Sequence, residues 1–126
     1  MERGGFFRFS LDVSQTQSQV SVSAGVGETG IRLIARLTEN GAPFEIEPGS
    51  YAVFSAVKPD GKPIFNDCMI FGTGTVVYDF TEQTVAIPGI VRCQIFVYAP
   101  DGTLMISPRL QLVVHDNVYN KDIEST

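Results

Sequence analysis

Two nearly identical turn motifs constrain the fold of this chain more than any other feature of its sequence. Pro59-Asp60-Gly61 and Pro100-Asp101-Gly102 each separate two apolar runs that have the composition of β-strands. Proline sets φ for a turn, aspartate accepts hydrogen bonds from the nearby backbone, and glycine adopts the left-handed conformation that returns the chain. A third turn signal lies at Asn40-Gly41. The motifs therefore predict β-hairpins in an antiparallel β domain.

Alternation of apolar and polar residues predicts eight or nine short strands along the chain. In the first of them, Phe7 and Phe9 alternate with Phe6 and Arg8. The expected strands are residues 6–13, 20–24, 31–38, 51–58, 64–71, 75–80, 90–99, 103–107 and 110–114. Turn signals recur about every ten residues and helical periodicity is almost absent, which is typical of two packed sheets. We therefore expect an all-β fold, and an antiparallel β-sandwich rather than a barrel.

Residues 81–87 allow two interpretations. Thr81 is a suitable cap for a short helical turn that Pro88-Gly89 would end, and a tight corner fits the same residues equally well.

Length and composition indicate one globular domain. The chain has 126 residues, of which 44% are hydrophobic and 18% charged, far from the composition of disordered chains. We expect the domain to span residues 1–115 and the polar residues 116–126 to form a tail or the start of a linker. No run reaches the roughly 20 apolar residues of a membrane span, and residues 1–11 do not resemble a secretion signal, so we expect synthesis in the cytoplasm.

The charge pattern argues against a nucleic-acid partner. The net charge is −5, and the lysines and arginines are scattered along the sequence. Only Arg32 and Arg36 share a strand face, where they form either a small basic spot or an ordinary solvated surface. Cys68 and Cys93 have no metal-ligand spacing. We expect two buried free thiols, although a disulfide stays open if their strands face each other.

Aromatic residues on outward strand positions are the candidate binding residues. If Val91 and Ile95 point into the core, the neighbouring Phe96 and Tyr98 point outward, and the same parity argument applied to the strand 51–58 places Phe54 outward. Exposed aromatic residues are typical of the centres of protein interfaces. The candidate contact residues for a subunit or partner are Phe6, Phe54, Phe96 and Tyr98. The alternative is that other segments of the same chain cover them.

No set of residues predicts catalysis, a cofactor or a metal. His115 is the single histidine and has no nucleophile motif beside it. Asp60 and Asp101 belong to turns that need aspartate for the backbone, and calcium takes a cluster of oxygen ligands. No glycine-rich loop opens a helix, as a phosphate cradle requires. We therefore expect a protein that is not an enzyme.

The order of turns and apolar strands between Leu37 and Val114 resembles a known family. It contains Thr38-Glu39-Asn40-Gly41-Ala42-Pro43-Phe44-Glu45-Ile46, Lys58-Pro59-Asp60-Gly61, Ala86-Ile87-Pro88-Gly89-Ile90-Val91 and Ile106-Ser107-Pro108. This order is similar to the N-terminal domain of phage baseplate upper proteins, from siphophages and prophages of Gram-positive bacteria. The resemblance covers roughly two-thirds of the chain and rests on turns rather than on catalytic signatures.

The resemblance implies an immunoglobulin-like sandwich and a structural role in the virion. Such a domain docks onto the core of the tail baseplate, alongside other tail proteins and as a homo-oligomer in the particle, and a following region presents receptor-binding parts. No binding residue is transferred from the family. A second hypothesis is a carbohydrate- or host-surface-binding module, although the chain has no tryptophan for a sugar platform. A third is an accessory domain of an enzyme.

Overall fold

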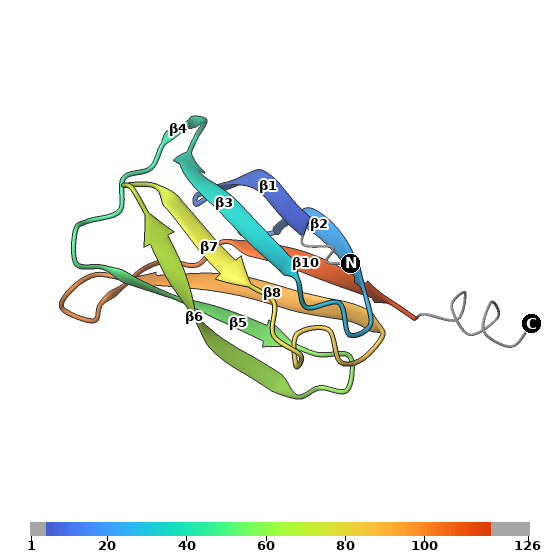
Figure 1. The fold of residues 1–126 in the computed structure, drawn as a ribbon. Coiled ribbons are helices and arrows are strands. Elements are labelled where there is room, and N and C mark those ends of the chain that lie inside the picture. Colours follow the sequence, from blue (N-terminus) through green and yellow to red (C-terminus); the bar gives the residue numbers. More distant parts are fainter. Residues whose placement is uncertain (1–4, 117–126) are drawn as a thin grey trace, which may run out of the picture.

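The computed structural model describes residues 5–116, so the predicted tail lies outside the described residues except for Asp116. Within this range the chain is all-β, has no helix and contains ten strands (Figure 1). The strands are β1 (Gly5–Asp12), β2 (Ser18–Gly25), β3 (Ile31–Glu39), β4 (Ala42–Pro43), β5 (Tyr51–Val57), β6 (Pro63–Phe71), β7 (Thr75–Asp79), β8 (Gly89–Tyr98), β9 (Leu104–Ile106) and β10 (Arg109–His115). The one strand beyond the nine expected ranges is β4, which has two residues.

The strands form one nearly closed sheet that is folded into two layers. Its order is β1-β3-β7-β6-β5-β8-β10-β2, with β4 beside β3 and β9 beside β8. The first part of β6 pairs with β5, whereas Met69–Phe71 pair with β7, so β6 turns the corner between the layers. At the opposite edge β1 and β2 lie close to each other. We call β1, β3, β7 and the end of β6 the front layer, and the start of β6 with β5, β8, β10 and β2 the back layer.

The expectation of a purely antiparallel fold was wrong at two pairings. β1 pairs with β3 in parallel, and β2 pairs with β10 in parallel. The reason is that the chain leaves the front layer after β1, adds β2 to the back layer, and returns for β3. Two strands that are separated by such a crossing can run in the same direction, which alternation of residues does not reveal.

The two predicted hairpins are confirmed. β5 pairs with β6 and β8 with β9, both antiparallel. Asp60 Oδ1 accepts the Lys62 N–H at 3.0 Å, and Asp101 Oδ1 accepts the Thr103 N–H at 3.0 Å. Both aspartates therefore serve their own turns, as the sequence predicted.

The segment after β7 is a tight corner rather than a helical turn. The Thr84 N–H donates to the Thr81 carbonyl at 3.1 Å, and the Ala86 N–H donates to the Gln83 carbonyl at 3.4 Å. These are two successive turns. Val85 is fully buried and anchors the corner in the core.

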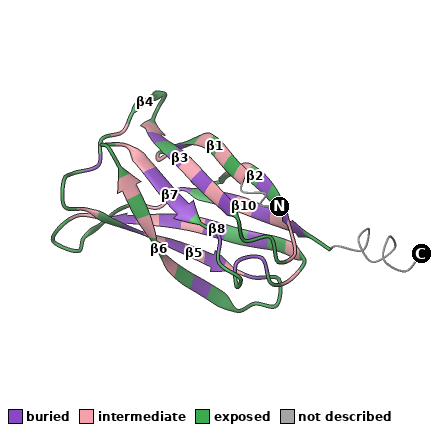
Figure 2. Cartoon of the chain, viewed as in Figure 1, coloured by how far each residue is buried: buried purple, intermediate pink, exposed green. Residues whose placement is uncertain are grey.

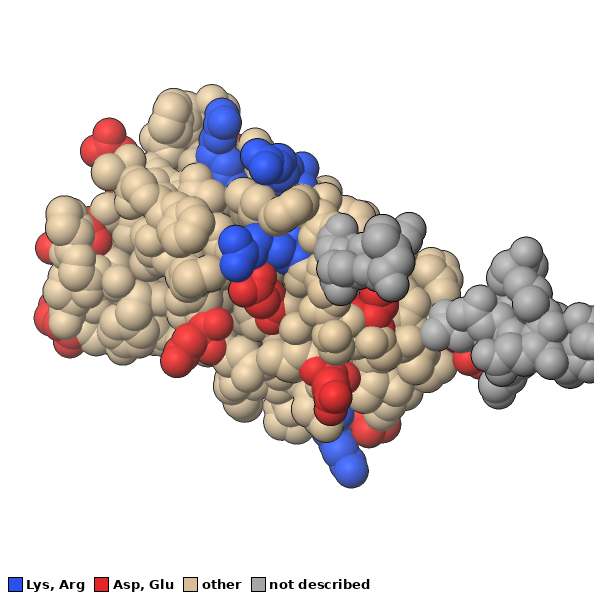
Figure 3. Space-filling model, viewed as in Figure 1, with Lys and Arg blue, Asp and Glu red and all other residues tan. Residues whose placement is uncertain are grey.

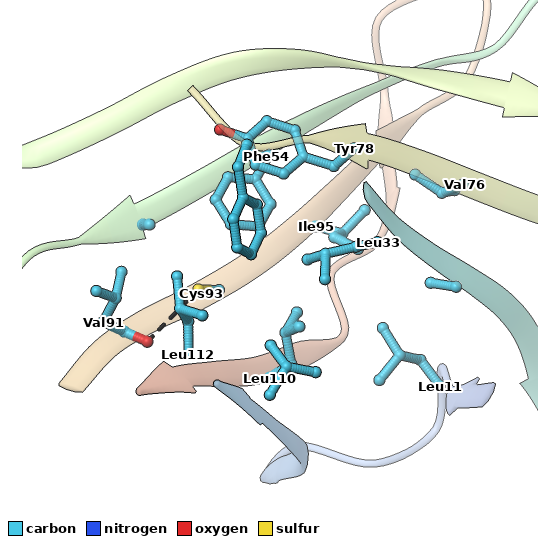
Figure 4. Packing of buried hydrophobic residues seen from close by; sticks show 14 of the residues in the cluster. Leu11, Leu33, Phe54, Val76, Tyr78, Val91, Cys93, Ile95, Leu110 and Leu112 are labelled. Atoms are coloured by element: carbon cyan, nitrogen blue, oxygen red, sulfur yellow. Dashed lines mark hydrogen bonds between the residues drawn. The ribbon is translucent and has the colours of Figure 1, made fainter. Parts of the chain in front are cut away.

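Buried residues alternate along the strands and meet between the layers (Figure 2). On β8 the predicted inward set is confirmed, since Val91, Cys93, Ile95 and Val97 are all buried. Figure 4 shows Val91, Cys93 and Ile95 together with leucines from both layers. The fully buried leucines include Leu11, Leu33, Leu37, Leu110 and Leu112.

The outward placement predicted for Phe54 was wrong. Its side chain is 0% exposed and stacks on Tyr78 with 3.8 Å between the ring centroids (Figure 4). Phe54 lies opposite Ile95, so the inward face of β8 continues across β5. Ala52 and Ala56 flank Phe54 on the same face and leave room for its ring. The apolar residues of β5 are compatible with either orientation, and pairing with β8 selects the one in which the large ring is buried.

The two cysteines are free, and the strand register keeps them apart. Cys68 lies opposite Ala52, whereas Cys93 lies opposite Ala56 on the other side of β5. Four residues of strand separate these positions by roughly 13 Å, which is too far for a disulfide. Cys93 is buried as predicted and Cys68 only partly so. Burial raises the pKa of each thiol to about 12.

Candidate functional site

The four predicted contact residues do not form a single surface. Phe6 lies on the outer face of the front layer and is 63% exposed. Phe96 and Tyr98 lie on the outer face of the back layer, where both are partly exposed. The outward placement of these three residues is confirmed, and their contact with a partner stays a prediction. Phe54 points between the layers and is excluded as a contact residue.

Apolar residues of the back layer gather at one end of its outer face. Tyr51 of β5 lies opposite Tyr98 of β8, and their rings stack at 5.0 Å between centroids. Val53 lies opposite Phe96, whose ring centroid is 6.4 Å from that of Tyr98. Leu104 of β9 pairs with Tyr98 on its other side. We call Tyr51, Val53, Phe96, Tyr98 and Leu104 the tyrosine face.

Four of the five residues of the tyrosine face lie on β5 and β8, which pair with a strand on each side and so give these side chains a rigid base. Tyr51 is 49% exposed and Leu104 47% exposed. Stacking against Tyr98 restricts the Tyr51 ring before any partner arrives, so little conformational entropy remains to be lost on contact.

A groove of about 360 Å³, lined by both polar and apolar residues, runs along the same outer surface, across β5, β8 and β10. Its polar lining consists of Ser18, Ser55, Arg92, Gln94, Arg109 and Gln111. Two of these side chains are held by hydrogen bonds. Gln94 Nε2 donates to the Ser107 carbonyl at 3.0 Å, and Gln111 Nε2 donates to Ser21 Oγ at 3.2 Å. We call this the arginine groove.

The basic spot predicted from Arg32 and Arg36 lies on the outer face of the front layer, but Arg32 is paired with an acidic residue. Arg32 donates from Nε and Nη2 to the two carboxylate oxygens of Asp79, at 2.6 and 3.0 Å. This ion pair lowers the pKa of Asp79 and raises that of Arg32. Arg8 joins the spot with its guanidinium 5.8 Å from the centre of the Phe6 ring. Figure 3 shows the arginines of this face together, with acidic side chains close by, so the spot is partly neutralised.

The described residues contain no candidate metal site. No three histidine, cysteine, aspartate or glutamate side chains of residues 5–116 are grouped so that they could hold a metal ion. His115 is exposed at the end of β10, and its carbonyl accepts the Val26 N–H at 2.9 Å. A helix able to cross a bilayer does not occur in the same stretch.

The sequence analysis did not identify Tyr51 as part of the aromatic surface. It also did not show that Arg92 and Arg109 line the same groove. The wrong orientation of β5 explains the first omission, because an inward Phe54 places Tyr51 and Val53 outward. The serine at position 55 was the available signal, since a polar residue between Val53 and Val57 indicates that this set faces solvent. The arginines are 17 residues apart, and only the register of β8 and β10 brings them together.

Comparison with known proteins identifies a matching family and a similar solved structure. The family model of the BppU N-terminal domain matches residues 7–126. The N-terminal domain of phage TP901-1 ORF48 is similar in structure, with a TM-score of 0.72 and 14% sequence identity. The match covers 88% of this chain and 98% of that one. At this identity the likeness concerns the fold alone. No curated protein sequence matches the chain.

Proposed function

Since the chain belongs to the family of the BppU (baseplate upper protein) N-terminal domain, a structural component of the phage tail baseplate, we propose that it docks onto the baseplate core through its tyrosine face. In this proposal the domain is a part of the virion that is made in the bacterial host cytoplasm and assembled into the tail of a phage or prophage. It holds position and orientation for receptor-binding parts further along the protein. We also propose that its two layers correspond to an immunoglobulin-like sandwich.

The stacked pair of Tyr51 and Tyr98 is the observation that carries the docking proposal. Aromatic residues are enriched at the centres of protein interfaces, where they supply a large contact area with few rotatable bonds. The pair lies beside Phe96 and Leu104 on a rigid sheet, so a partner would meet a preformed apolar surface.

Repetition strengthens such a contact in an assembled particle. We propose that several copies of the chain occupy equivalent positions in the baseplate. A modest contact made by each copy then adds up to a stable attachment, because linked copies bind with a high effective concentration.

The test is complex formation between the chain and a baseplate core protein of the same phage. The wild-type chain is expected to elute with the core protein in size-exclusion chromatography with light scattering at micromolar concentration. Replacing both tyrosines (Tyr51→Ala with Tyr98→Ala) is expected to weaken the complex by about 30-fold or more, since interface hot spots cost at least about 2 kcal/mol.

Phe6→Ala is the matched control, because it removes an exposed aromatic residue from the other layer. We expect it to dock like the wild type, because Phe6 lies on the opposite outer face, so that the contact predicted for Phe6 would be with another partner. A complex that survives loss of both tyrosines but not loss of Phe6 would assign docking to the front layer and refute the proposal. Absence of any complex with the wild-type chain would refute docking itself.

A carbohydrate- or host-surface-binding module is the second candidate function. One observation favours it, namely that exposed tyrosines lie beside a groove lined by serine, glutamine and arginine. A glycan array or a cell-wall binding assay separates the two candidates. Glycan binding by the isolated chain that disappears with Tyr51→Ala would favour this function over docking.

A further inference from the structure

We infer that the arginine groove binds an acidic side chain of the docking partner, so that the partner presents an aspartate or glutamate next to its apolar contact. The inference rests on the proposed docking function and adds the chemistry of the partner to it.

The register of β8 and β10 places two arginines diagonally on one surface. Arg92 lies opposite Gln111, and Arg109 lies opposite Gln94. Diagonal neighbours of this kind have backbones roughly 7–8 Å apart, within reach of each other's long side chains. Both arginines are exposed and line the same groove. Their guanidinium groups can therefore approach one ligand together.

The lining of the groove itself contains no aspartate or glutamate. The outward positions of β5, β8 and β10 hold apolar, aromatic, serine and glutamine residues and His115 besides the two arginines, and no aspartate or glutamate. An exposed carboxylate of the same layer, Asp67 of β6, lies opposite Val53, whereas Arg92 lies opposite Val57, four residues further along β5. On the front layer Arg32 already binds Asp79, whereas Arg8 and Arg36 line a hollow that also has no carboxylate but lies on the face opposite the tyrosines. The groove thus presents two positive charges without a carboxylate, on a chain whose net charge is −5.

A carboxylate is the ligand that this arrangement fits. Guanidinium groups bind carboxylates through two parallel hydrogen bonds, which adds direction to the charge attraction. The glutamine and serine side chains of the groove offer further polar contacts around such a ligand.

The position of the groove selects a protein side chain over a free anion. The groove and the tyrosine face share the outer surface of β5 and β8, since Ser55 of the groove and Val53 of the tyrosine face lie on one face of β5. A partner seated on the tyrosines would therefore cover the arginines too. Complementary charges at the edge of an apolar contact raise the association rate and fix the orientation of the partners.

The first test compares two charge-neutralised variants in the docking assay. Replacing both groove arginines (Arg92→Gln with Arg109→Gln) is expected to weaken the complex by at least about tenfold at low salt and to reduce the salt dependence of binding. The control is Arg8→Gln with Arg36→Gln, which removes the same charge from the front layer and is expected to change the affinity less than about twofold. An equal loss in both variants would show a non-specific charge effect and overturn the inference.

The second test needs no partner protein. The isolated chain is titrated with glutarate, a dicarboxylate that represents the glutamate side chain, and the Nε–H signals of its arginines are followed by NMR. Saturable shifts of Arg92 and Arg109, with Arg32 unaffected because Asp79 already binds it, are the expected result. Absence of such shifts would overturn the inference.

The outcomes separate this inference from the proposed function. Docking that is lost with the tyrosines but unchanged without the groove arginines would refute the inference alone. Failure to dock at all would refute the proposed function, and the glutarate titration would still decide whether the groove takes a carboxylate. Self-association of the chain that disappears with the groove arginines would assign the carboxylate to a second copy, and would overturn the choice of another protein.

Discussion

Phe54 and Tyr51 are close neighbours on β5 with opposite environments. Phe54 is fully buried against Tyr78 and Ile95, whereas Tyr51 is about half exposed and stacks on Tyr98. Residues three apart on a strand point to opposite faces, so one aromatic ring fills the core and the other builds the outer surface. The same strand therefore connects stability with the proposed binding surface.

The residue-scale prediction concerns the burial of Phe54. Phe54→Ala is expected to lower the free energy of unfolding by about 3–5 kcal/mol, because it removes buried apolar contacts and leaves a cavity between the layers. Phe65→Ala is the control, since Phe65 lies on the neighbouring strand β6 and is 68% exposed. It is expected to cost less than about 1 kcal/mol. Guanidinium unfolding followed by circular dichroism measures both, and similar losses would contradict the burial of Phe54.

At the scale of elements, hydrogen bonds connect the corner between β7 and β8 to both layers. Thr84 is buried, and its hydroxyl lies 2.7 Å from the Tyr78 hydroxyl and 3.0 Å from that of Thr81. The Lys58 ammonium group, at the end of β5, donates to Gln83 Oε1 at 2.8 Å. These contacts hold the corner against the core and against the β5–β6 hairpin, so the corner sets the position at which β8 begins.

Gly89 provides the prediction at this scale. Its φ is +128°, and a Cβ atom at this position would lie 2.8 Å from Cγ of Pro59. Gly89→Ala is therefore expected to destabilise the fold by more than about 2 kcal/mol, through backbone strain together with a collision.

Gly61→Ala is the matched control for Gly89. Gly61 has a φ of +86° with nothing within 4 Å of an added Cβ, so only the strain of about 1–2 kcal/mol is expected. Thermal unfolding of both variants, converted to free energies, measures the difference. Equal losses would indicate that Pro59 does not restrict the corner.

At the scale of the whole molecule, the sheet contains pairings between strands that are distant in sequence. β2 pairs with β10 and β1 with β3, so both N-terminal strands are held by later parts of the chain. Gln111 and Ser21, which are 90 residues apart, share a hydrogen bond across one of these pairings. Forming such pairings requires closure of long loops, whose entropy cost comes before the contacts that repay it.

This topology predicts slow folding. The main refolding phase is expected to fall in the range of about milliseconds to seconds, as for other β proteins with distant pairings, whereas an isolated hairpin forms in about 1–10 μs. Stopped-flow tyrosine fluorescence can follow it, because the chain has no tryptophan. Refolding that is complete within microseconds would contradict a sheet in which β2 pairs with β10.

The sequence by itself determined the features that depend on near neighbours in the chain. Alternation and turn residues predicted the all-β class, the two hairpins, the inward face of β8 and the free cysteines, because side-chain direction and turn geometry are set within a few residues. The resemblance to baseplate upper proteins came from the same local order of turns and strands.

Only the tertiary structure decided the features that depend on pairing between distant segments. It reversed the orientation of β5, made two pairings parallel, stacked Tyr51 on Tyr98, and brought Arg92 beside Arg109. The apolar residues of β5 are compatible with either face, so its orientation follows from the strand with which it pairs. Both surfaces proposed for binding arise in this way, because each combines residues of strands that are adjacent in the sheet and separated in the sequence.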